Sequence, residues 1–391
     1  MMRVDDLGTA QRLRQLWSDG VGGVAAQQAE PVQHPHPHTL TVALLTLGDP
    51  QTMTGGYAYH QRVAARAPAN DARVEFLSFP AWPFPLPALA GPAILRATAR
   101  LRPDVLLLDS IAAAFLPPWL FVARRLPPLV AILHQPPGGI DHAALRQRVY
   151  AVLDRQAYRR AARLLVASAD LADCLHRSGM PQRLLRVVPP GRDPAAAPAL
   201  PDEDLRAGRR AAVLSVGNWV ARKGLHDLLE AIAHLPDDAV TLHLVGNTSV
   251  DPAYSAKVRA RLAAADLAGR VVVHGPLPAA EVAGFYRAAD VFALASVLEP
   301  YGTVYSEAMA AGLPVVGWSA GNLPHLARHG VEGLVVPPGD RVALADALKS
   351  LALDEPLRRR MSAAATRRAE DFPTWDETAR MLFTELRAVL A

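Results

Sequence analysis

Short apolar runs recur along this chain from residue 40 onward, and segments with helical spacing separate them. Such runs are typical of strands in a mostly parallel sheet whose two faces are covered by helices. The alternation therefore predicts an α/β protein built from βαβ units. The runs form two series: residues 40–47, 73–79, 104–110, 129–134, 163–168 and 185–191, and then 211–217, 240–246, 270–275, 291–297, 313–318 and 333–339. Helices are predicted in the second half at residues 225–234, 254–265, 279–288, 305–311, 341–352 and 375–390.

A segment without helical or strand periodicity separates the two series. It reads RDPAAAPALPDEDLRAGRR over residues 192–210, a composition that is typical of a linker. At 391 residues the chain also exceeds what one hydrophobic core usually organises. We therefore predict two doubly wound Rossmann-like domains, at 39–198 and 211–372, that face a central cleft and are joined by a linker at 199–210. Residues 373–391 are predicted as a helix that crosses back to the first domain.

Residues 1–38 are predicted to be a flexible extension with one short helix at 9–17. The segment ends in HPHPH, where alternating prolines forbid regular pairing. Its histidines, His34, His36 and His38, have adventitious metal binding as an alternative interpretation. The chain starts with no secretory leader and has a single cysteine, Cys174, so we expect a cytoplasmic protein without an internal disulfide.

Composition excludes several classes of protein. With 51% hydrophobic and 20% charged residues the chain is not of the disordered class, and no uncharged apolar stretch is long enough to span a bilayer. The net charge of +4 is mildly basic, but aromatic residues do not alternate with Lys and Arg, so no nucleic-acid partner is expected. A basic helical stretch at 146–163 predicts either a solvated helix or a weak contact with the inner membrane face.

Two cations stand just after the first strand of the second series. Arg222 and Lys223 precede a predicted helix at the carboxyl edge of the sheet. Cations and a helix N-terminus together suit a phosphate or diphosphate group. The alternative interpretation is a solvated basic turn.

The stretch EPYGTVYSE, residues 299–307, follows another strand and carries two glutamates around a glycine. Gly302 allows close approach of the backbone to a ligand, and the amides of Thr303 and Val304 begin a helix. Glu299 and Glu307 would repel a phosphate unless they bind something else, and sugar hydroxyls are natural donors to a carboxylate. The alternative is a pair of surface residues at a helix start.

The first domain offers a weaker signal. Gly55 and Gly56 lie between the first strand and a helix, but they lack the GxGxxG spacing of a dinucleotide site. His134 ends a predicted central strand, where a functional role and an ordinary core histidine are equally good interpretations.

Taken together, these residues resemble the retaining glycosyltransferases of the GT-B fold, and in particular the nucleotide-sugar-dependent family 4. The resemblance runs from about residue 40 to the end and depends most on the two glutamates separated by seven residues. It implies that Glu299 holds the transferred sugar and Glu307 the ribose of the donor. It implies further that Lys223 neutralises the leaving diphosphate, that the amides from Gly302 to Val304 meet the distal phosphate, and that Gly56 and His134 lie near the donor sugar.

The resemblance also assigns the wall beside the nucleobase to residues at the end of one strand: His274, Gly275, Pro276 and Leu277. Two positions depart from the family pattern. Asn218 stands where an arginine is common, so one expected cation is missing, and Arg222 either supplies it or points elsewhere. The stretch AGNLPH places His325 where a glutamate is frequent.

The expected reaction is transfer of a hexosyl unit from a nucleotide-diphosphate sugar to an acceptor hydroxyl, with retention implied by the resemblance. Because no DxD-like acidic pair lies at a fitting strand end, we expect no metal and no cofactor. The acceptor would bind loops at 48–54, 80–92 and 109–118, whose composition names no ligand. The alternatives are a catalytically impaired sugar-nucleotide-binding protein, a GT-B epimerase or a phosphorylase.

Overall fold

The computed structural model describes residues 39–50, 55–120, 123, 126–140, 144–193 and 200–391. The predicted helix at 9–17 and the three histidines at 34, 36 and 38 lie outside the described residues. Residues 39–391 pack as one compact unit that contains two parallel sheets. No helix among the described residues is both long and apolar enough to cross a membrane.

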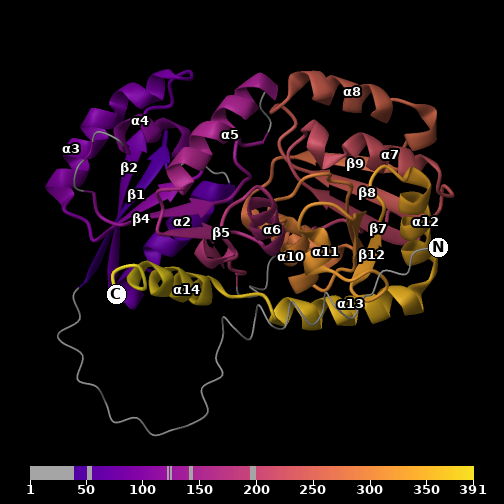
Figure 1. Ribbon diagram of the computed structural model, residues 1–391. Helices are drawn as coiled ribbons and strands as arrows, with labels where there is room; N and C mark the ends of the chain where they lie inside the picture. The colour runs from indigo at the N-terminus through magenta and orange to yellow at the C-terminus, as the bar shows by residue number, and fades with distance from the viewer. Residues whose placement is uncertain (1–38, 51–54, 121–122, 124–125, 141–143, 194–199) are drawn as a thin grey trace, which may run out of the picture. The chain divides into compact units, whose positions relative to one another are not determined.

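The N-terminal sheet contains six parallel strands in the order β2-β1-β3-β4-β5-β6 (Figure 1). These strands are β1 (Leu40–Leu47), β2 (Ala72–Phe79), β3 (Val105–Asp109), β4 (Leu129–Leu133), β5 (Arg163–Val166) and β6 (Leu185–Val187). The intervening helices are α2 (Gly55–Ala65), α3 (Gly91–Leu101), α4 (Pro117–Leu120), α5 (Ala144–Tyr158) and α6 (Ala169–Arg177). The order reverses between β1 and β3, which is the switch point of this sheet.

The C-terminal sheet repeats this design in the order β12-β11-β10-β7-β8-β9. Its strands are β7 (Ala211–Val216), β8 (Val240–Val245), β9 (Val271–Gly275), β10 (Val291–Leu294), β11 (Val315–Trp318) and β12 (Gly333–Val336). Its helices are α7 (Leu225–Ala233), α8 (Pro252–Leu262), α9 (Ala279–Ala288), α10 (Thr303–Ala310), α11 (Leu323–Leu326), α12 (Arg341–Leu353) and α13 (Glu355–Glu370). The switch point of this sheet lies between β7 and β10.

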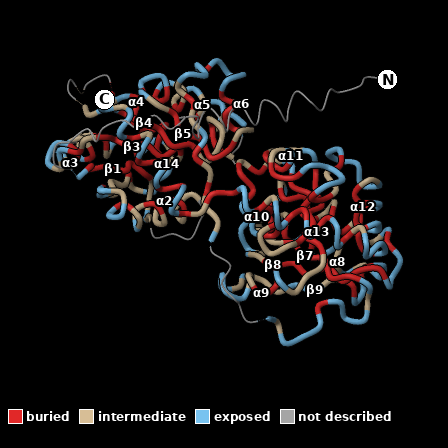
Figure 2. The backbone as a smooth tube through the Cα atoms, turned by 90° about the horizontal axis from the view of Figure 1, so that it is seen from below, coloured by how far each residue is buried: buried red, intermediate tan, exposed pale blue. Residues whose placement is uncertain are grey.

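Buried apolar residues line both faces of each sheet. Figure 2 shows buried backbone through the interior of both sheets. The apolar runs predicted this arrangement, and the predicted α/β fold of two doubly wound domains is confirmed. The domain limits at 39, 199, 211 and 373, and the cleft between the domains, stay predictions. Several strands end earlier than their apolar runs: β10 stops at Leu294, so residues 295–297 belong to the loop that follows.

The final helix, α14 (Trp375–Arg387), packs against the N-terminal sheet (Figure 1). Trp375 and Phe383 belong to the same apolar cluster as Val42 and Val105 of that sheet. The segment that leads into α14 lies beside the end of the first domain, where Arg192 N donates to Pro373 O at 2.7 Å.

Helix α13 was not predicted from the sequence. Its charged sequence, EPLRRRMSAAATRRAE, has only a sparse apolar stripe. The Asp354 side chain accepts a hydrogen bond from Leu357 N at 2.9 Å and so caps the first turn, and the alanines favour the helical conformation. Met361 and Ala365 are nevertheless buried against the domain.

Candidate active site

Two loops meet at the switch point of the C-terminal sheet. Strands β7 and β10 are hydrogen-bonded neighbours, so the segments that follow them emerge side by side at the carboxyl edge. Lys223 follows β7 and Glu299 follows β10. Nζ of Lys223 lies 2.6 Å from Oε1 of Glu299, and both side chains are buried.

Arg222 contacts the same carboxylate. Its Nη1 lies 3.2 Å from Oε1 of Glu299 and donates to Leu298 O at 3.1 Å. The buried hydroxyl of Ser296 lies 2.8 Å from Oε1 as well. Two cations and a hydroxyl therefore converge on one oxygen. The sequence did not predict this convergence, because it indicated the cations and the carboxylate only as separate ligand contacts.

Glycines allow the two loops to approach each other. Gly224 has φ of +65°, and a Cβ there would lie 1.9 Å from Ala295 O, in the loop after β10. Gly321 has φ of +55°, and its Cβ would lie 2.7 Å from Glu299 N. Any other residue at position 224 would push apart the segments that carry Lys223 and Glu299, and one at position 321, in the loop after β11, would collide with the backbone of Glu299.

The AGNLPH stretch forms hydrogen bonds with the loop that carries Glu299. Asn322 is buried and donates from Nδ2 to Tyr301 O at 2.9 Å. Its own amide donates to Glu299 O at 3.1 Å. His325, the second departure from the family pattern, accepts a hydrogen bond from Arg368 at its carbonyl oxygen.

Helix α10 begins beside this cluster. Its N-cap, Gly302, has φ of +83° and offers no side chain to the first amides. Thr303 is exposed and Val304 is half-buried at the first positions of the helix. An uncapped helix start next to two cations is suited to binding an anion.

Glu307 lies one turn further along α10. The residue is exposed, but its carboxyl group accepts a hydrogen bond from the Tyr286 hydroxyl at 3.1 Å. Reduced hydration of the carboxyl group raises the pKa of Glu307 to about 7, although the bond from Tyr286 opposes the shift. Tyr286, on α9, is a site neighbour that the sequence did not indicate.

Asn218 is exposed and follows β7 by two residues, where its Oδ1 accepts from Asn247 N at 3.3 Å. The structure thus places Arg222, and not Asn218, next to Lys223. A second cation is therefore present at this site despite the departure at position 218.

The predicted nucleobase wall lies at and beyond the end of β9, an edge strand of the sheet. His274 and Leu277 are half-buried, as is Gly275, whereas Pro276 is exposed. His274 stacks on His243 with ring centroids 5.3 Å apart, and burial lowers the pKa of both imidazoles. His243 itself is buried, so only the half-buried His274 ring lies partly open at the end of the sheet.

In the N-terminal domain, Gly55 and Gly56 begin α2, and His134 follows β4. A Cβ on Gly56 would lie 3.7 Å from the His134 ring, an ordinary contact distance, so the structure brings the two predicted residues together. Burial lowers the pKa of His134 to about 3, and neighbouring His60 adds to this effect. The imidazole of His134 is therefore neutral near pH 7.

Two further residues beside His134 were missed by the sequence interpretation. His60, on α2, and Asp109, at the end of β3, are both buried, with His60 Nε2 lying 3.0 Å from Asp109 Oδ2. Burial opposes ionisation of Asp109, yet His60 and hydrogen bonds outweigh it and lower the pKa of the carboxyl group. The two residues are far apart along the chain, so no local signal indicates this contact.

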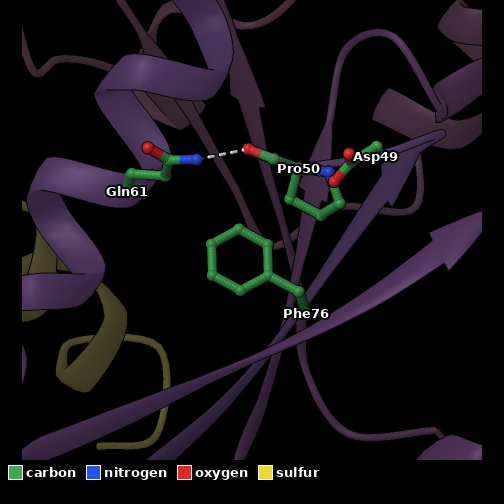
Figure 3. Close-up of a pocket in the computed structure, with 4 residues that line it drawn as sticks. All are labelled: Asp49, Pro50, Gln61 and Phe76. Carbon is green, nitrogen blue, oxygen red and sulfur yellow. Dashed lines mark hydrogen bonds between the residues drawn. The ribbon is translucent and has the colours of Figure 1, made fainter. Parts of the chain in front are cut away.

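A pocket of about 610 Å³ lies elsewhere in the N-terminal domain, between the loop after β1, helix α2 and strand β2 (Figure 3). Its lining residues are Asp49, Pro50, Gln61 and Phe76, and Gln61 Nε2 donates to Pro50 O at 2.6 Å. None of the predicted site residues lines it. Asp49 and Pro50 do belong to a loop predicted to bind the acceptor.

Two family models match consecutive parts of the sequence. Residues 20–191 match a glycosyl transferase 4-like domain, and residues 199–368 match the glycosyl transferases group 1. The chain belongs to the group 1 glycosyltransferases. The predicted glycosyltransferase family is therefore confirmed, whereas the two-glutamate motif, retention of configuration and the roles of individual residues stay predictions.

Curated relatives of this group 1 chain carry one recurring name. A D-inositol 3-phosphate glycosyltransferase of Xylanimonas cellulosilytica is 34% identical over 55% of this chain and 54% of the relative. A protein of the same name from Jonesia denitrificans is 31% identical over 67% of this chain and 66% of the relative. The chain spans about half the length of the first of these relatives.

Solved structures share the fold of this group 1 chain. Sucrose-phosphate synthase from Thermosynechococcus elongatus superposes with a TM-score of 0.77 at 21% identity, over 90% of this chain and 99% of that one. The Anabaena protein HepE, solved with UDP and glucose, superposes with a TM-score of 0.73 at 22% identity, over 89% of this chain and 100% of that one. At this identity the likeness establishes the fold alone.

Proposed function

We propose that this chain is a retaining glycosyltransferase that moves a hexosyl unit from a nucleotide-diphosphate sugar to an acceptor hydroxyl. One observation carries the proposal: Lys223, Arg222 and Glu299 converge at the switch point of the C-terminal sheet, beside the uncapped start of α10. A diphosphate next to two cations and a sugar next to a carboxylate match this set of groups.

Departure of the diphosphate is the step that the cations would assist. As the bond between the anomeric carbon and the phosphate oxygen breaks, negative charge grows on the diphosphate and positive charge on the sugar. Lys223 and Arg222 are already in place for this charge, so they stabilise the transition state without reorganisation of solvent. The backbone N–H groups of Thr303 and Val304, at the start of α10, add the partial positive charge of the helix N-terminus.

Glu299 has a second role in this proposal. Without donor its carboxylate holds both cations in position, at 2.6 and 3.2 Å. With donor bound, the diphosphate competes for the cations while the sugar hydroxyls donate to the carboxylate. The ion pairs of Glu299 with Lys223 and Arg222 would then be replaced by contacts of the cations with the diphosphate and of the carboxylate with the sugar. This replacement limits the free-energy cost of separating buried charges.

Retention requires the acceptor hydroxyl to approach the anomeric carbon from the face that the diphosphate leaves. In the proposal the hydroxyl oxygen forms the new bond, and its proton passes to a departing phosphate oxygen. His134, neutral and near Gly56, would contact the donor sugar from the first domain. Proton NMR of the product formed from an α-linked donor tests this step, because an α-linked product supports retention and a β-linked product contradicts it.

Divalent metal is not required at the diphosphate in this proposal, because Lys223 and Arg222 supply its counter-charge. Residual transfer in excess chelator is the expected result. Complete loss of transfer with rescue by Mg²⁺ or Mn²⁺ would refute metal independence.

Donor and acceptor are the first unknowns to test. A thermal-shift panel of nucleotide sugars should include UDP-glucose, since a donor that binds raises the apparent stability by mass action. D-inositol 3-phosphate, named in the relatives, is the first acceptor to assay with each donor that binds. Donor binding without turnover across many acceptors would favour the alternative, an impaired sugar-nucleotide-binding protein.

Weak contact with the inner membrane face belongs to the proposal as a secondary feature, with the reaction in the cytoplasm. Helix α5 exposes Leu145, Val149 and Val152 together with Arg146 and Arg148. Apolar and basic residues on one exposed helix suit an anionic lipid surface. Co-sedimentation with vesicles that contain anionic lipid, but not with neutral vesicles, is the expected result.

A further inference from the structure

Three potential metal ligands lie together at the carboxyl edge of the N-terminal sheet. They are His60 on α2, Asp109 at the end of β3 and His134 after β4. Each offers one nitrogen or oxygen atom, and these atoms all lie within 4.8 Å of one another. Since β3 and β4 are adjacent strands and Asp109 pairs with Ile132, the sheet brings Asp109 and the segment that carries His134 to the same edge.

His60 and Asp109 are close together, but they do not form a hydrogen bond of acceptable geometry. His60 Nε2 is 3.0 Å from Asp109 Oδ2, yet this buried nitrogen has no hydrogen-bond partner of acceptable angle. Atoms that bind one ion at about 2.0–2.2 Å are separated by about 3–3.5 Å and point at the ion instead of at each other. His134 Nε2 is also buried without a partner.

Hydrogen bonds from neighbouring residues fix the position of the Asp109 carboxylate. Thr46 Oγ1 donates to Oδ2 of Asp109 at 3.0 Å, and the amide of Ile111 donates to Oδ1 at 3.2 Å. Ser110 Oγ lies 3.3 Å from Oδ1. Hydrogen bonds of this kind orient metal ligands in known sites and contribute to their affinity.

The geometry points to a binding site for one divalent transition-metal ion, with His60, Asp109 and His134 as its ligands. Two imidazoles and one carboxylate favour Zn²⁺ or Co²⁺ over Mg²⁺, which prefers an all-oxygen shell. Separations of up to 4.8 Å exceed the separation of about 3–3.5 Å between ligand atoms of one tetrahedral ion, so binding must draw the most widely separated ligand atoms together by about 1.5 Å.

This inference goes beyond the proposed function. The ion would not contact the leaving diphosphate, whose counter-charges lie in the C-terminal domain. It would occupy the free nitrogen of His134, so Zn²⁺ is expected to inhibit transfer, while Mg²⁺ has no such effect. Because binding is measured without turnover, its failure and the failure of the proposed function are distinguishable.

The test uses the full chain with His34, His36 and His38 changed to Gln, which removes competing imidazoles of the N-terminal segment. After dialysis against chelator and its removal, Zn²⁺ is titrated by calorimetry and Co²⁺ by visible absorption. One ion per chain is expected. His60→Gln and His134→Gln should each weaken binding by about tenfold or more.

His176→Gln is the matched control, since His176 is an exposed histidine on α6 of the same domain. It should leave both titrations unchanged. X-ray absorption at the zinc edge, on protein that keeps His60, Asp109 and His134, gives a measurement that does not depend on how the variants fold. Two imidazole nitrogens bound to zinc support the site.

Three results would overturn the inference. One is the loss of all binding when the N-terminal histidines are replaced. Another is unchanged affinity in folded His60→Gln and His134→Gln proteins. The third is zinc bound without imidazole. In each case His60, Asp109 and His134 form only a buried polar network.

Discussion

Lys223 and Glu299 come from separate loops of the C-terminal domain, yet Nζ of the first lies 2.6 Å from Oε1 of the second at the boundary of strands β7 and β10. Both are buried, and Arg222 and Ser296 contact the same oxygen. The pair thus links the loop expected to bind phosphate with the loop expected to bind sugar. A change at either residue should therefore affect both the stability of the domain and its reaction.

Lys223→Met should lower both stability and turnover. Removing one member of a buried ion pair typically costs about 3–5 kcal/mol, and the remaining Arg222 should reduce this to about 2–3 kcal/mol. Urea unfolding and initial rates measure the two effects. Lys349→Met, at an exposed position on α12, is the control and should change neither. A Lys223→Met enzyme with normal stability would mean that the pair is not formed in solution.

Replacing the two glutamates should have different kinetic effects. Glu307→Ala should mainly raise KM for the donor, because a ribose contact is lost in ground state and transition state alike. Glu299→Ala should mainly lower kcat, because the transferred sugar loses its orientation. Glu281→Ala, exposed on α9, serves as the control. Unchanged kinetics in both site variants would contradict the assignment.

Donor affinity should rise with pH around neutrality. The pKa of Glu307 is raised to about 7, so its carboxyl group ionises between about pH 6 and 8. The ionised form accepts ribose hydroxyls more strongly, by about 1 kcal/mol or roughly fivefold in Kd. Calorimetry at pH 6 and 8 should show this ratio. Glu307→Gln should lose it, and a ratio equal in both proteins would assign the pH dependence to the donor itself.

Gly224→Ala should destabilise the protein more than Gly208→Ala. Both glycines have positive φ, +65° and +79°, so each substitution carries a backbone cost of about 1–2 kcal/mol. Only at Gly224 would the new Cβ also collide with Ala295 O, whereas nothing lies within 4 Å at Gly208. Thermal unfolding should therefore separate the two, and equal losses would show that the loops can move apart freely.

Asp154→Asn should stabilise the protein at alkaline pH. Asp154 is buried, and burial raises its pKa to about 7, while Gly138 N donates to Oδ2 at 2.8 Å. The folded protein thus keeps a proton that the unfolded chain releases above about pH 4. The stabilisation that this proton provides falls as pH rises from about 4 to 7, and it is absent above that range.

Asn keeps the acceptor for Gly138 but cannot ionise. The Tm difference between Asp154→Asn and the parent should therefore be small at pH 4 and reach several degrees at pH 8. Asp346→Asn, at an exposed position on α12, should show no such trend. A difference that does not depend on pH would mean that Asp154 ionises normally in the folded protein.

Much of the fold is already set by local sequence. Apolar runs of six to eight residues between helical segments predict buried parallel strands, because only a sheet covered on both faces accepts side chains that are apolar in both directions. Glycine and charge directly after such runs indicated the loops at 222–223 and 299–307. The helix at 355–370 could not be predicted in this way, because its many arginines mask the few apolar contacts it makes.

The sequence by itself determined which segments are strands, which loops carry charge, and where Gly302 permits a helix to begin. Only the tertiary structure decided which strands are neighbours. That order places Lys223 and Arg222 on Glu299, and it gathers His60, Asp109 and His134 from separate elements. The physical reason is that periodicity reports the burial of a strand but not its position in the sheet, and a charged side chain finds its partner only after burial removes the water around it.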